Sequence, residues 1–401
     1  MWRLFSTRPH SMSSPMVENT LIYLSSGRIP TEKANGLQIV QMCHAFTSHV
    51  REVLLMVPKR KNLIAQDVFS YYHLPPTFHI LYLSVWDLVD WGKIAYIFHR
   101  LMYAVTAARW ITRQKEPATI YARDHYTAGL LCFLGLRNIF WEAHEGNAGP
   151  LIRYLLSHAA GIICISEGVK NALQKQTFVS ETRFLVAPDG VDMEEYANLP
   201  EKSVCRERVG MRNDQRILLY TGHLYEWKGV HTLAEAARLL PPEIQVWFLG
   251  GTEEDIRLFQ ERYKDVKNVT CLGHVDHARV AEYQRAADVV VLPNSAKSSL
   301  SKHYTSPLKL FEYMASGTPI LATDIPSLRE ILDDETAAWC PPDDPKEMAE
   351  ALQKICLSYD QAEKRAASAM ARIHAYDWQN RAKSILAFID KRLSHVQAPS
   401  P

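Results

Sequence analysis

The chain has 401 residues, of which 47% are hydrophobic and 22% are charged, a composition typical of globular proteins and not of disordered ones. Its formal net charge of +1 excludes a global positive field of the kind that attracts nucleic acid or an acidic surface. The 7 cysteines are scattered and form no C-x-x-C pair, which argues against a disulfide framework or a structural zinc site and predicts a reducing, cytoplasmic setting.

The first seventeen residues are basic and serine-rich and contain no acidic residue. We predict a disordered leader over residues 1–17. Two origins would give this composition: a transit peptide, or a start upstream of the natural one at Met16. No uncharged apolar window of the sequence reaches the roughly 18–20 residues that would span a bilayer.

Short apolar runs alternate with helix-length segments, which is typical of parallel α/β units. In the first half we expect strands at Thr20–Ser25, Glu52–Val57, Thr119–Ala122, Asn138–Ala143 and Gly161–Ile165. In the second half we expect them at Ile217–Thr221, Gln245–Leu249, Val269–Leu272, Val289–Leu292 and Pro319–Ala322. The turn-rich segment VAPDGVDMEEYANLPEKS between the halves is the predicted linker.

The pattern predicts two Rossmann-like, doubly wound α/β domains, over residues 18–192 and 200–375. In such sheets ligands bind beyond the carboxyl ends of the strands. A ligand that both domains share would therefore lie between them.

A long stretch from Trp86 to Gln114 carries aromatic and aliphatic residues on a helical background, with basic residues interspersed. It predicts either an interfacial helix that docks on lipid or a helix that packs on the first sheet. The topology requires a helix before the Thr119 strand, so packing on the sheet is the favoured interpretation.

The segment TSPLKLFEYMASGTPILATDIPSLREIL predicts a helix of about three turns followed by a strand. Ser306 is a good N-cap, Pro307 suits the first helical position, and Gly317 suits a left-handed C-terminal cap. The N–H groups and the positive dipole end at the start of this helix would form an anion site. Glu312 lies one and a half turns in, where its carboxylate could accept hydrogen bonds from two ribose hydroxyls. The alternative is that Ser306 only caps the helix and Glu312 makes a surface ion pair.

A strand, a glycine turn and the start of a helix are expected in ILLYTGHLYEWKG. Lys228 stands immediately before Gly229, where that helix begins. A lysine in this place could reach the phosphates of a ligand that lies over the end of the strand.

Taken in order, these segments resemble retaining glycosyltransferase family 4, which has the GT-B fold (glycosyl transferases group 1). The resemblance covers about residues 19–390 and rests on the motifs RDHYTAGLL, FWEAHEG, ICISEGVKNAL, VAPDGVD, YTGHLYEWKGVHTL, CLGHV, ADVVVLP, SPLKLFEYMASGTPILATDIPSLREIL and YDWQNRAKSIL. It implies that the N-terminal domain binds the acceptor and the C-terminal domain binds a nucleotide-sugar donor. It also implies that a C-terminal helix over residues 376–393, around Trp378, crosses back onto the N-terminal domain.

Carried over residue by residue, the resemblance implies three catalytic residues. Lys228 would neutralise the donor diphosphate, Glu312 would bind the ribose, and His144 would face the donor sugar and the acceptor.

The same resemblance implies a set of donor-binding positions. Backbone amides at Ser306, Pro307 and Leu308 would hold the distal phosphate, and the loop over residues 27–36 would overhang the phosphates. The main chain near Gly273, His274 and Val275 would border the base. The remaining donor-binding positions are Gly27, Gly222, His223 and Tyr304.

The chain departs from the family pattern in three places. His223 stands where the family usually has an arginine, so a permanent cation becomes a titratable one. Tyr304 stands where the family usually has an acidic residue, so the contact of that acid with the sugar would have to come from His303, Lys302 or the main chain. The first loop lacks the common double glycine and has in its place Ser25, Ser26 and Gly27.

No Asp-x-Asp pair occurs in the sequence, so we expect a metal-independent reaction. Lys228, His223 if protonated, and the amides of residues 306–308 would then stabilise the charge on the departing diphosphate. The resemblance implies a hexosyltransferase that retains the anomeric configuration by front-face attack. It would need no cofactor besides its donor, a nucleotide-diphosphate sugar, and would serve polysaccharide biosynthesis.

The acceptor stays open between a glycan, a lipid-linked molecule and a small molecule, and a lipid-linked one would bring peripheral contact with the inner membrane face. Two other functions also stay open: a GT-B sugar-nucleotide epimerase, and a catalytically idle nucleotide-binding scaffold. Glu142 and Glu145 flank His144 and could act as a general base, but the sequence favours neither. Nucleic-acid binding finds no support in the charge balance.

Overall fold

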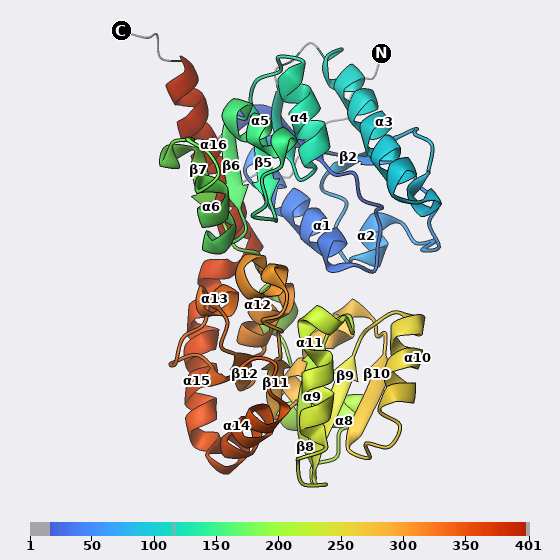
Figure 1. The fold of residues 1–401 in the computed structure, drawn as a ribbon, viewed down its shortest axis with the longest axis vertical. Helices are drawn as coiled ribbons and strands as arrows, with labels where there is room; N and C mark the ends of the chain where they lie inside the picture. The colour runs from blue at the N-terminus through green and yellow to red at the C-terminus, as the bar shows by residue number, and fades with distance from the viewer. Residues whose placement is uncertain (1–16, 115, 117, 398–401) are drawn as a thin grey trace.

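The computed structural model describes residues 17–114, 116 and 118–397, which form two α/β domains stacked one above the other in Figure 1. Each domain is built on one parallel sheet with helices on both faces, so the predicted fold class is confirmed. The predicted leader lies, except for Val17, outside the described residues.

The N-terminal sheet has the strand order β3-β2-β1-β4-β5-β6-β7. Strand β1 pairs with both β2 and β4, so the point where the strand order reverses lies between β1 and β4. The strands are β1 (Val17–Leu24), β2 (Val50–Pro58), β3 (His79–Leu83), β4 (Ala118–Ala122), β5 (Ile139–Ala143), β6 (Gly161–Cys164) and β7 (Phe184–Val186).

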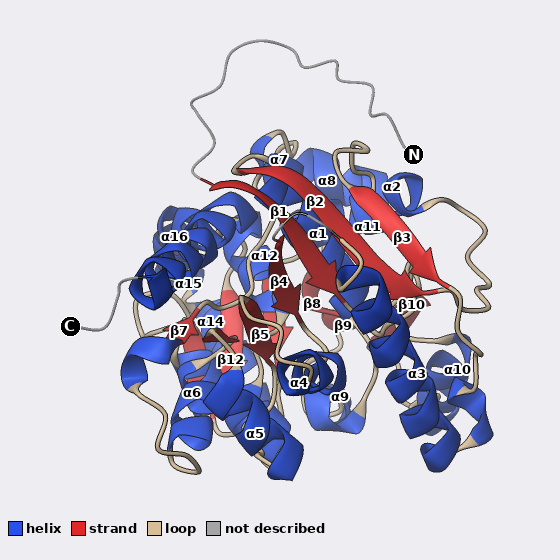
Figure 2. Cartoon of the chain, turned by 90° about the horizontal axis from the view of Figure 1, so that it is seen from above, coloured by secondary structure: helices blue, strands red, loops and turns tan. Residues whose placement is uncertain are grey.

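Both faces of this sheet are covered by helices, as the buried strands require. Leu21 and Tyr23 of β1 point into one core, whereas Ile22 and Leu24 point into the other. The first core lies under α1 (Ala34–Thr47), and the short α2 (Val68–Tyr71) borders it. The second core lies under α3 (Lys93–Ile111), α4 (His125–Phe133), α5 (Pro150–His158) and α6 (Glu167–Gln174). Figure 2 shows α4, α5 and α6 together on one side of the strands.

The C-terminal sheet has the order β10-β9-β8-β11-β12-β13, and its strand order reverses between β8 and β11. The run VVVL of β11 is wholly buried, as expected of a strand inside a parallel sheet. The strands are β8 (Arg216–Thr221), β9 (Ile244–Leu249), β10 (Val269–Gly273), β11 (Val289–Leu292), β12 (Ile320–Thr323) and β13 (Ala338–Cys340).

Helices divide over the two faces of this sheet as well. One face is covered by α7 (Glu194–Ala197), α8 (Lys202–Val209), α11 (His277–Ala286), α12 (Leu308–Ser316) and α13 (Pro326–Arg329). The other face is covered by α9 (Val230–Ala237), α10 (Glu253–Arg262) and α14 (Pro345–Leu357), while α15 (Tyr359–Arg372) contributes to both cores.

The last helix, α16 (Trp378–Gln397), returns to the N-terminal domain. A bridge between Val191 and Asp377 brings the linker and the start of this helix side by side. Trp378, Ile385 and Ile389 are then buried in the core that α1 covers. The predicted crossing of the C-terminal helix is therefore confirmed, and the two domains are joined by two passages of the chain.

The predicted strands are all present, whereas β3, β7 and β13 were not predicted from the sequence. All three lie at edges of their sheets. Two of them have only three residues, and β3 is partly exposed, so none produces a continuous apolar run.

The favoured interpretation of residues 86–114 holds for one side of the helix only. Tyr103 and Ala107 of α3 pack on the sheet. The helix begins later than the apolar stretch, because Gly92 has a φ of 96° and separates it from a short 3₁₀ turn at Val89–Trp91. Its opposite side is exposed.

Candidate functional site

The predicted phosphate-binding residues meet where the strand order of the C-terminal sheet reverses. Lys228 ends a 3₁₀ turn, Glu226–Lys228, in the loop after β8, and α12 follows β11. The Lys228 Nζ lies 3.7 Å from the point that a Cβ on Gly222 would occupy. Gly222 itself has a φ of 117°, so a side chain there would strain the backbone.

Lys228 is held in place by the glycine that follows it. Gly229 has a φ of 74°, and a Cβ on it would lie only 1.7 Å from the carbonyl oxygen of Pro293, after β11. Only glycine lets the two loops approach so closely. Burial lowers the pKa of Lys228 to about 8, and Glu312 opposes this shift.

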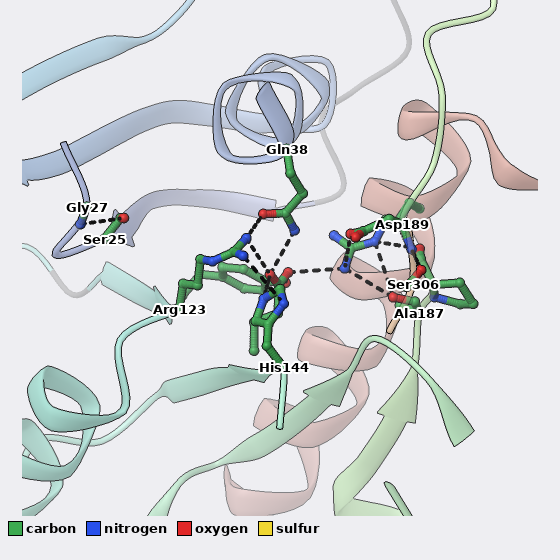
Figure 3. Close-up of polar contacts among 12 residues, drawn as sticks. Ser25, Gly27, Gln38, Arg123, His144, Ala187, Asp189 and Ser306 are labelled. Carbon is green, nitrogen blue, oxygen red and sulfur yellow. Dashed lines mark hydrogen bonds and ion pairs between the residues drawn. The ribbon is translucent and has the colours of Figure 1, made fainter. Parts of the chain in front are cut away.

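The start of α12 differs from the prediction by one residue. Pro307, with extended φ and ψ, is the N-cap, and Leu308 is the first helical residue. Ser306 does not cap the helix, because its hydroxyl accepts a hydrogen bond of 2.9 Å from the Asp189 amide of the linker (Figure 3). Pro307 has no N–H and cannot hold a phosphate, so Leu308 and Lys309 supply the N–H groups of the first turn. Gly317 caps the end with a φ of 65°, as predicted.

Glu312 makes no ion pair among the described residues, contrary to the alternative from the sequence. Its carboxylate accepts a hydrogen bond of 3.1 Å from Gln284 of α11 and lines a small cavity between the domains. Glu195 and His277 line the same cavity. Burial raises the pKa of Glu195 to about 8, and the nearby Asp192 and Glu312 add to this shift.

His223 does not replace the charge of the missing arginine at neutral pH. Its ring stacks on Tyr225, with 5.0 Å between ring centroids. Burial, then Lys228, lowers the pKa of His223 below its ordinary value. Asp255 and, from the loop after β1, Glu32 oppose the shift.

The predicted donor-binding positions after β10 lie next to a contact between the domains. Gly273 ends β10 with a φ of 77°, and His274 and Val275 follow it. The next residue, Asp276, lies 3.0 Å from Nε2 of His73 in the N-terminal domain.

Tyr304 lies against the loop that carries His144. It ends a π-helical turn, Leu300–Tyr304, and its ring packs so closely on Gly146 that a Cβ there would lie 2.8 Å from a ring atom. A Cβ on Gly168 of α6 would likewise lie only 1.8 Å from the carbonyl oxygen of His303. The turn that the family pattern fills with an acid is thus a contact surface between the domains.

His144 follows β5 directly and is bonded through both ring nitrogens. Its Nε2 lies 2.6 Å from Oε1 of Glu142, and its Nδ1 lies 3.5 Å from Nη2 of Arg123 (Figure 3). An ionised Glu142 can only accept, so Nε2 carries the proton and Nδ1 accepts from the guanidinium. Burial, followed by Arg123, lowers the pKa of His144 to about 4, while Glu142 opposes the shift. His144 is therefore neutral at pH 7.

Glu142 is fully buried and lies at the centre of a hydrogen-bonded network. It accepts hydrogen bonds from Gln38 of α1 at 2.8 Å and from Arg381 of α16 at 3.1 Å, and also from the hydroxyl of Tyr121. Burial alone would raise its pKa, but Arg381, His144 and Arg123 together hold that pKa well below its ordinary value. Glu145, by contrast, is exposed.

A hollow of about 490 Å³ opens beyond β1 and β4 in the N-terminal domain. Ser25, Ser26 and Gly27 form part of its wall, and the Gly27 amide donates to the Ser25 hydroxyl at 3.2 Å (Figure 3). Most of the other side chains that line the hollow are charged, namely Arg28, Glu32, Lys33, Arg60, Asp90, Arg100, Arg123 and Asp124.

Comparison with known proteins identifies the second domain. Residues 215–357 match the family glycosyl transferases group 1. The C-terminal domain is a glycosyl transferases group 1 domain. D-inositol 3-phosphate glycosyltransferase of Xylanimonas cellulosilytica is 27% identical over 223 residues, which are 51% of this chain and 50% of that protein. Phosphatidyl-myo-inositol mannosyltransferase of Mycolicibacterium smegmatis is 31% identical over 198 residues, which are 48% and 47% of the two chains. The chain spans about half the length of the curated relatives it matches.

Solved structures extend the likeness to the whole fold. Sucrose-phosphate synthase from Thermosynechococcus elongatus has a TM-score of 0.77 at 18% identity, over 94% of this chain and 100% of that one. Anabaena HepE in complex with UDP and glucose has a TM-score of 0.74 at 14% identity, over 93% and 100%. Both domains together therefore have the GT-B fold.

Several residues around the group 1 domain were not predicted from the sequence. Gln284 orients Glu312, and Lys309 lies beside Lys228 at the start of α12. Arg123 and Arg381 hold the Glu142 network, although Arg381 lies 239 positions after Glu142 in the sequence. One sequence signal could have pointed to Lys309: it lies in the first turn of the predicted helix, between the apolar residues Leu308 and Leu310.

Replacing Glu142 by glutamine should lower the free energy of unfolding by about 3–5 kcal/mol, because Arg381 would stay buried without its nearest counter-charge, with Asp189 left at 3.8 Å. Denaturation in urea measures this change. Glu145→Gln, which alters an exposed carboxylate next to the same histidine, is the control and should change little. Adding Arg381→Met to Glu142→Gln should restore part of the loss. Equal stability of the two single variants would contradict the role of the ion pair.

Proposed function

We propose that the protein transfers a sugar from a nucleotide-diphosphate sugar to an acceptor. The observation that carries the proposal is the cation at Lys228 beside the start of α12, in a group 1 domain at the reversal point of its sheet. An ammonium and helix N–H groups are the donors that bind phosphate in proteins. The relatives named above as glycosyltransferases and the UDP complex of HepE support the same reaction.

The leaving group decides the chemistry of this site. Cleavage of the bond between sugar and phosphate leaves negative charge on the diphosphate. Lys228 and the N–H groups of Leu308 and Lys309 would stabilise that charge without a metal ion, each such donor contributing about 2.7–4 kcal/mol in known enzymes. We expect retention of the anomeric configuration, with the departing phosphate accepting the proton of the acceptor hydroxyl.

His144 would act as a neutral group in this reaction. With a pKa of about 4 it stays uncharged at pH 7, and its Nε2–H donates a hydrogen bond to Glu142. The imidazole cannot take the acceptor proton in this arrangement. We assign it to positioning the sugar or the acceptor, which is also what the sequence resemblance implied.

The acceptor would enter the hollow beyond β1 and β4. The hollow lies in the N-terminal domain and includes the loop that reaches His223, so it borders the donor site. Arginine guanidinium groups in its wall, among them Arg28, Arg60 and Arg123, are donors suited to hydroxyl and phosphate oxygens.

The exposed side of α3 favours an acceptor held in a membrane surface. Ile94, Phe98, Leu101 and Val105 recur at helical spacing and form one apolar stripe, with exposed fractions of 86%, 48%, 44% and 44%. Trp91 precedes the stripe and is 78% exposed. Such a stripe is typical of helices that lie in a lipid interface.

The charges beside the stripe suit an anionic bilayer. Lys93, Arg109 and Arg113 are exposed on the same helix or just after it. Tyr96 and Arg100, also on α3, line the hollow. If α3 binds the membrane surface, the acceptor hollow would lie next to the lipid headgroups. None of the described helices has both the length and the hydrophobicity to cross a bilayer, so we propose peripheral contact only.

Lys228→Ala should lower the rate of sugar transfer by about 10²–10³, because one charged donor to the leaving group is lost. The assay offers UDP-, GDP- and ADP-sugars with extracted lipid and glycan acceptors and detects the released nucleoside diphosphate and the glycosylated product. Lys354→Ala, an exposed lysine on α14, is the control and should keep the full rate.

Chelation with EDTA forms a second arm of this assay and should leave the rate unchanged. A rate that disappears with EDTA and returns with Mg²⁺ would contradict the metal-independent mechanism. Conversion of the donor without any acceptor would favour an epimerase, and binding of nucleotide without turnover would favour an idle scaffold.

Charge placed in the apolar stripe should weaken membrane binding. Ile94→Glu with Phe98→Glu should reduce binding to vesicles of phosphatidylcholine and phosphatidylglycerol by at least about tenfold, since two apolar side chains could no longer be buried in lipid. Co-sedimentation measures the binding. Leu258→Glu changes an apolar side chain of α10 that is 53% exposed and should bind like the wild type. Equal binding of both variants, or no binding of the wild type, would contradict the proposed docking.

A further inference from the structure

We propose that Lys309 is a second phosphate-binding cation of the donor site, in place of the arginine that His223 has replaced. This inference rests on the proposed function, because it concerns the diphosphate of the same donor. It assigns to Lys309 a contact with the diphosphate, although its position in the helix would by itself suggest a lysine on the surface.

Lys309 is a buried lysine whose charge has no partner. The residue is 8% exposed, and its Nζ has no hydrogen-bond partner among the described residues. The ammonium lies 3.7 Å from the centroid of the Tyr220 ring, whose face attracts a cation but does not accept its protons as an oxygen would. A buried unpaired ammonium is costly, so the position is hard to explain by stability alone.

The position of Lys309 is that of a phosphate ligand. It is the second residue of α12, and its own N–H belongs to the first turn, where an anion would be held. The ring of Tyr220 lies under the turn at Gly222, with its hydroxyl 3.8 Å from the point that a Cβ on that glycine would occupy. The Nζ of Lys228 lies 3.7 Å from the same point. Lys228 therefore lies directly beside the turn at Gly222, and Lys309 lies over the tyrosine ring whose hydroxyl reaches the same turn.

The two ammonium groups act on each other. Burial, then Lys228, holds the pKa of Lys309 well below its ordinary value, and Glu312 opposes the shift. Burial lowers the pKa of Lys228 to about 8. A diphosphate between them would offset the repulsion, as its charge matches two cations. His223, neutral at pH 7, would contribute no charge of its own.

Phosphate-bound lysines and structural lysines respond to substitution in opposite ways. Lys309→Met keeps the length and the apolar stem of the side chain but removes the charge. We expect it to melt at a higher temperature than the wild type without nucleotide, since a buried charge is gone. We also expect its Kd for the nucleoside diphosphate to rise on the order of 10- to 100-fold, because a charge-assisted hydrogen bond is lost.

The experiment compares the wild type, Lys309→Met, Lys228→Met and the control Lys354→Met by calorimetric titration with UDP, GDP and ADP and with the matching monophosphates. Lys309→Gln is added so that the result does not depend on how well methionine packs. Loss of affinity for the diphosphate in both Lys309 variants, greater than for the monophosphate, with an unchanged control, is the expected result. Wild-type affinity in both Lys309 variants with weak binding in Lys228→Met would overturn this inference and leave the proposed function intact. No binding of any nucleotide by the wild type would overturn both.

Discussion

The buried ion pair between Glu142 and Arg381 is the interaction on which the arrangement of the molecule depends. Glu142 belongs to the N-terminal sheet, whereas Arg381 belongs to a helix that the chain reaches only after completing the C-terminal domain. The same guanidinium donates to the carbonyls of Ala187 and Pro188 in the linker. Both passages between the domains are thereby held at one carboxylate, which also fixes the tautomer of His144. Buried ion pairs often add little net stability. We interpret this pair as one that specifies how the linker and α16 pack against the N-terminal sheet.

The proposed donor site differs from this network in its balance of charge. The Glu142 network pairs its cations with an anion, whereas the charge of Lys228 acts on Lys309 and, among the described residues, Glu312 is the carboxylate that offsets both. Lowered pKa values of both lysines express the cost of this arrangement. Buried like charges that destabilise the free protein are typical of functional sites, because a ligand of opposite charge offsets their repulsion when it binds. Replacement of an arginine by His223 therefore does not by itself indicate a site that has lost its donor.

The sequence predicted those features that are decided locally. Gly229 and Gly317 have left-handed conformations that few other residues adopt, and their positions in the pattern predicted the start of α9 after Lys228 and the end of α12. Features decided by distant contacts were missed. The sequence could not show that the Ser306 hydroxyl would be taken by the linker, or that Glu142 would meet Arg381. The pattern also could not distinguish Lys309 from a surface lysine, since only packing over Tyr220 reveals its burial.

A crystal structure with a bound nucleoside diphosphate would test the assignment of the donor site most directly. Crystals would be grown with UDP, GDP and ADP in turn, in the presence of EDTA. We predict that the diphosphate lies at the start of α12, within hydrogen-bond distance of Nζ of both Lys228 and Lys309, with its ribose at Glu312. A nucleotide bound in the hollow of the N-terminal domain, or a diphosphate whose charge is met by neither lysine, would contradict it.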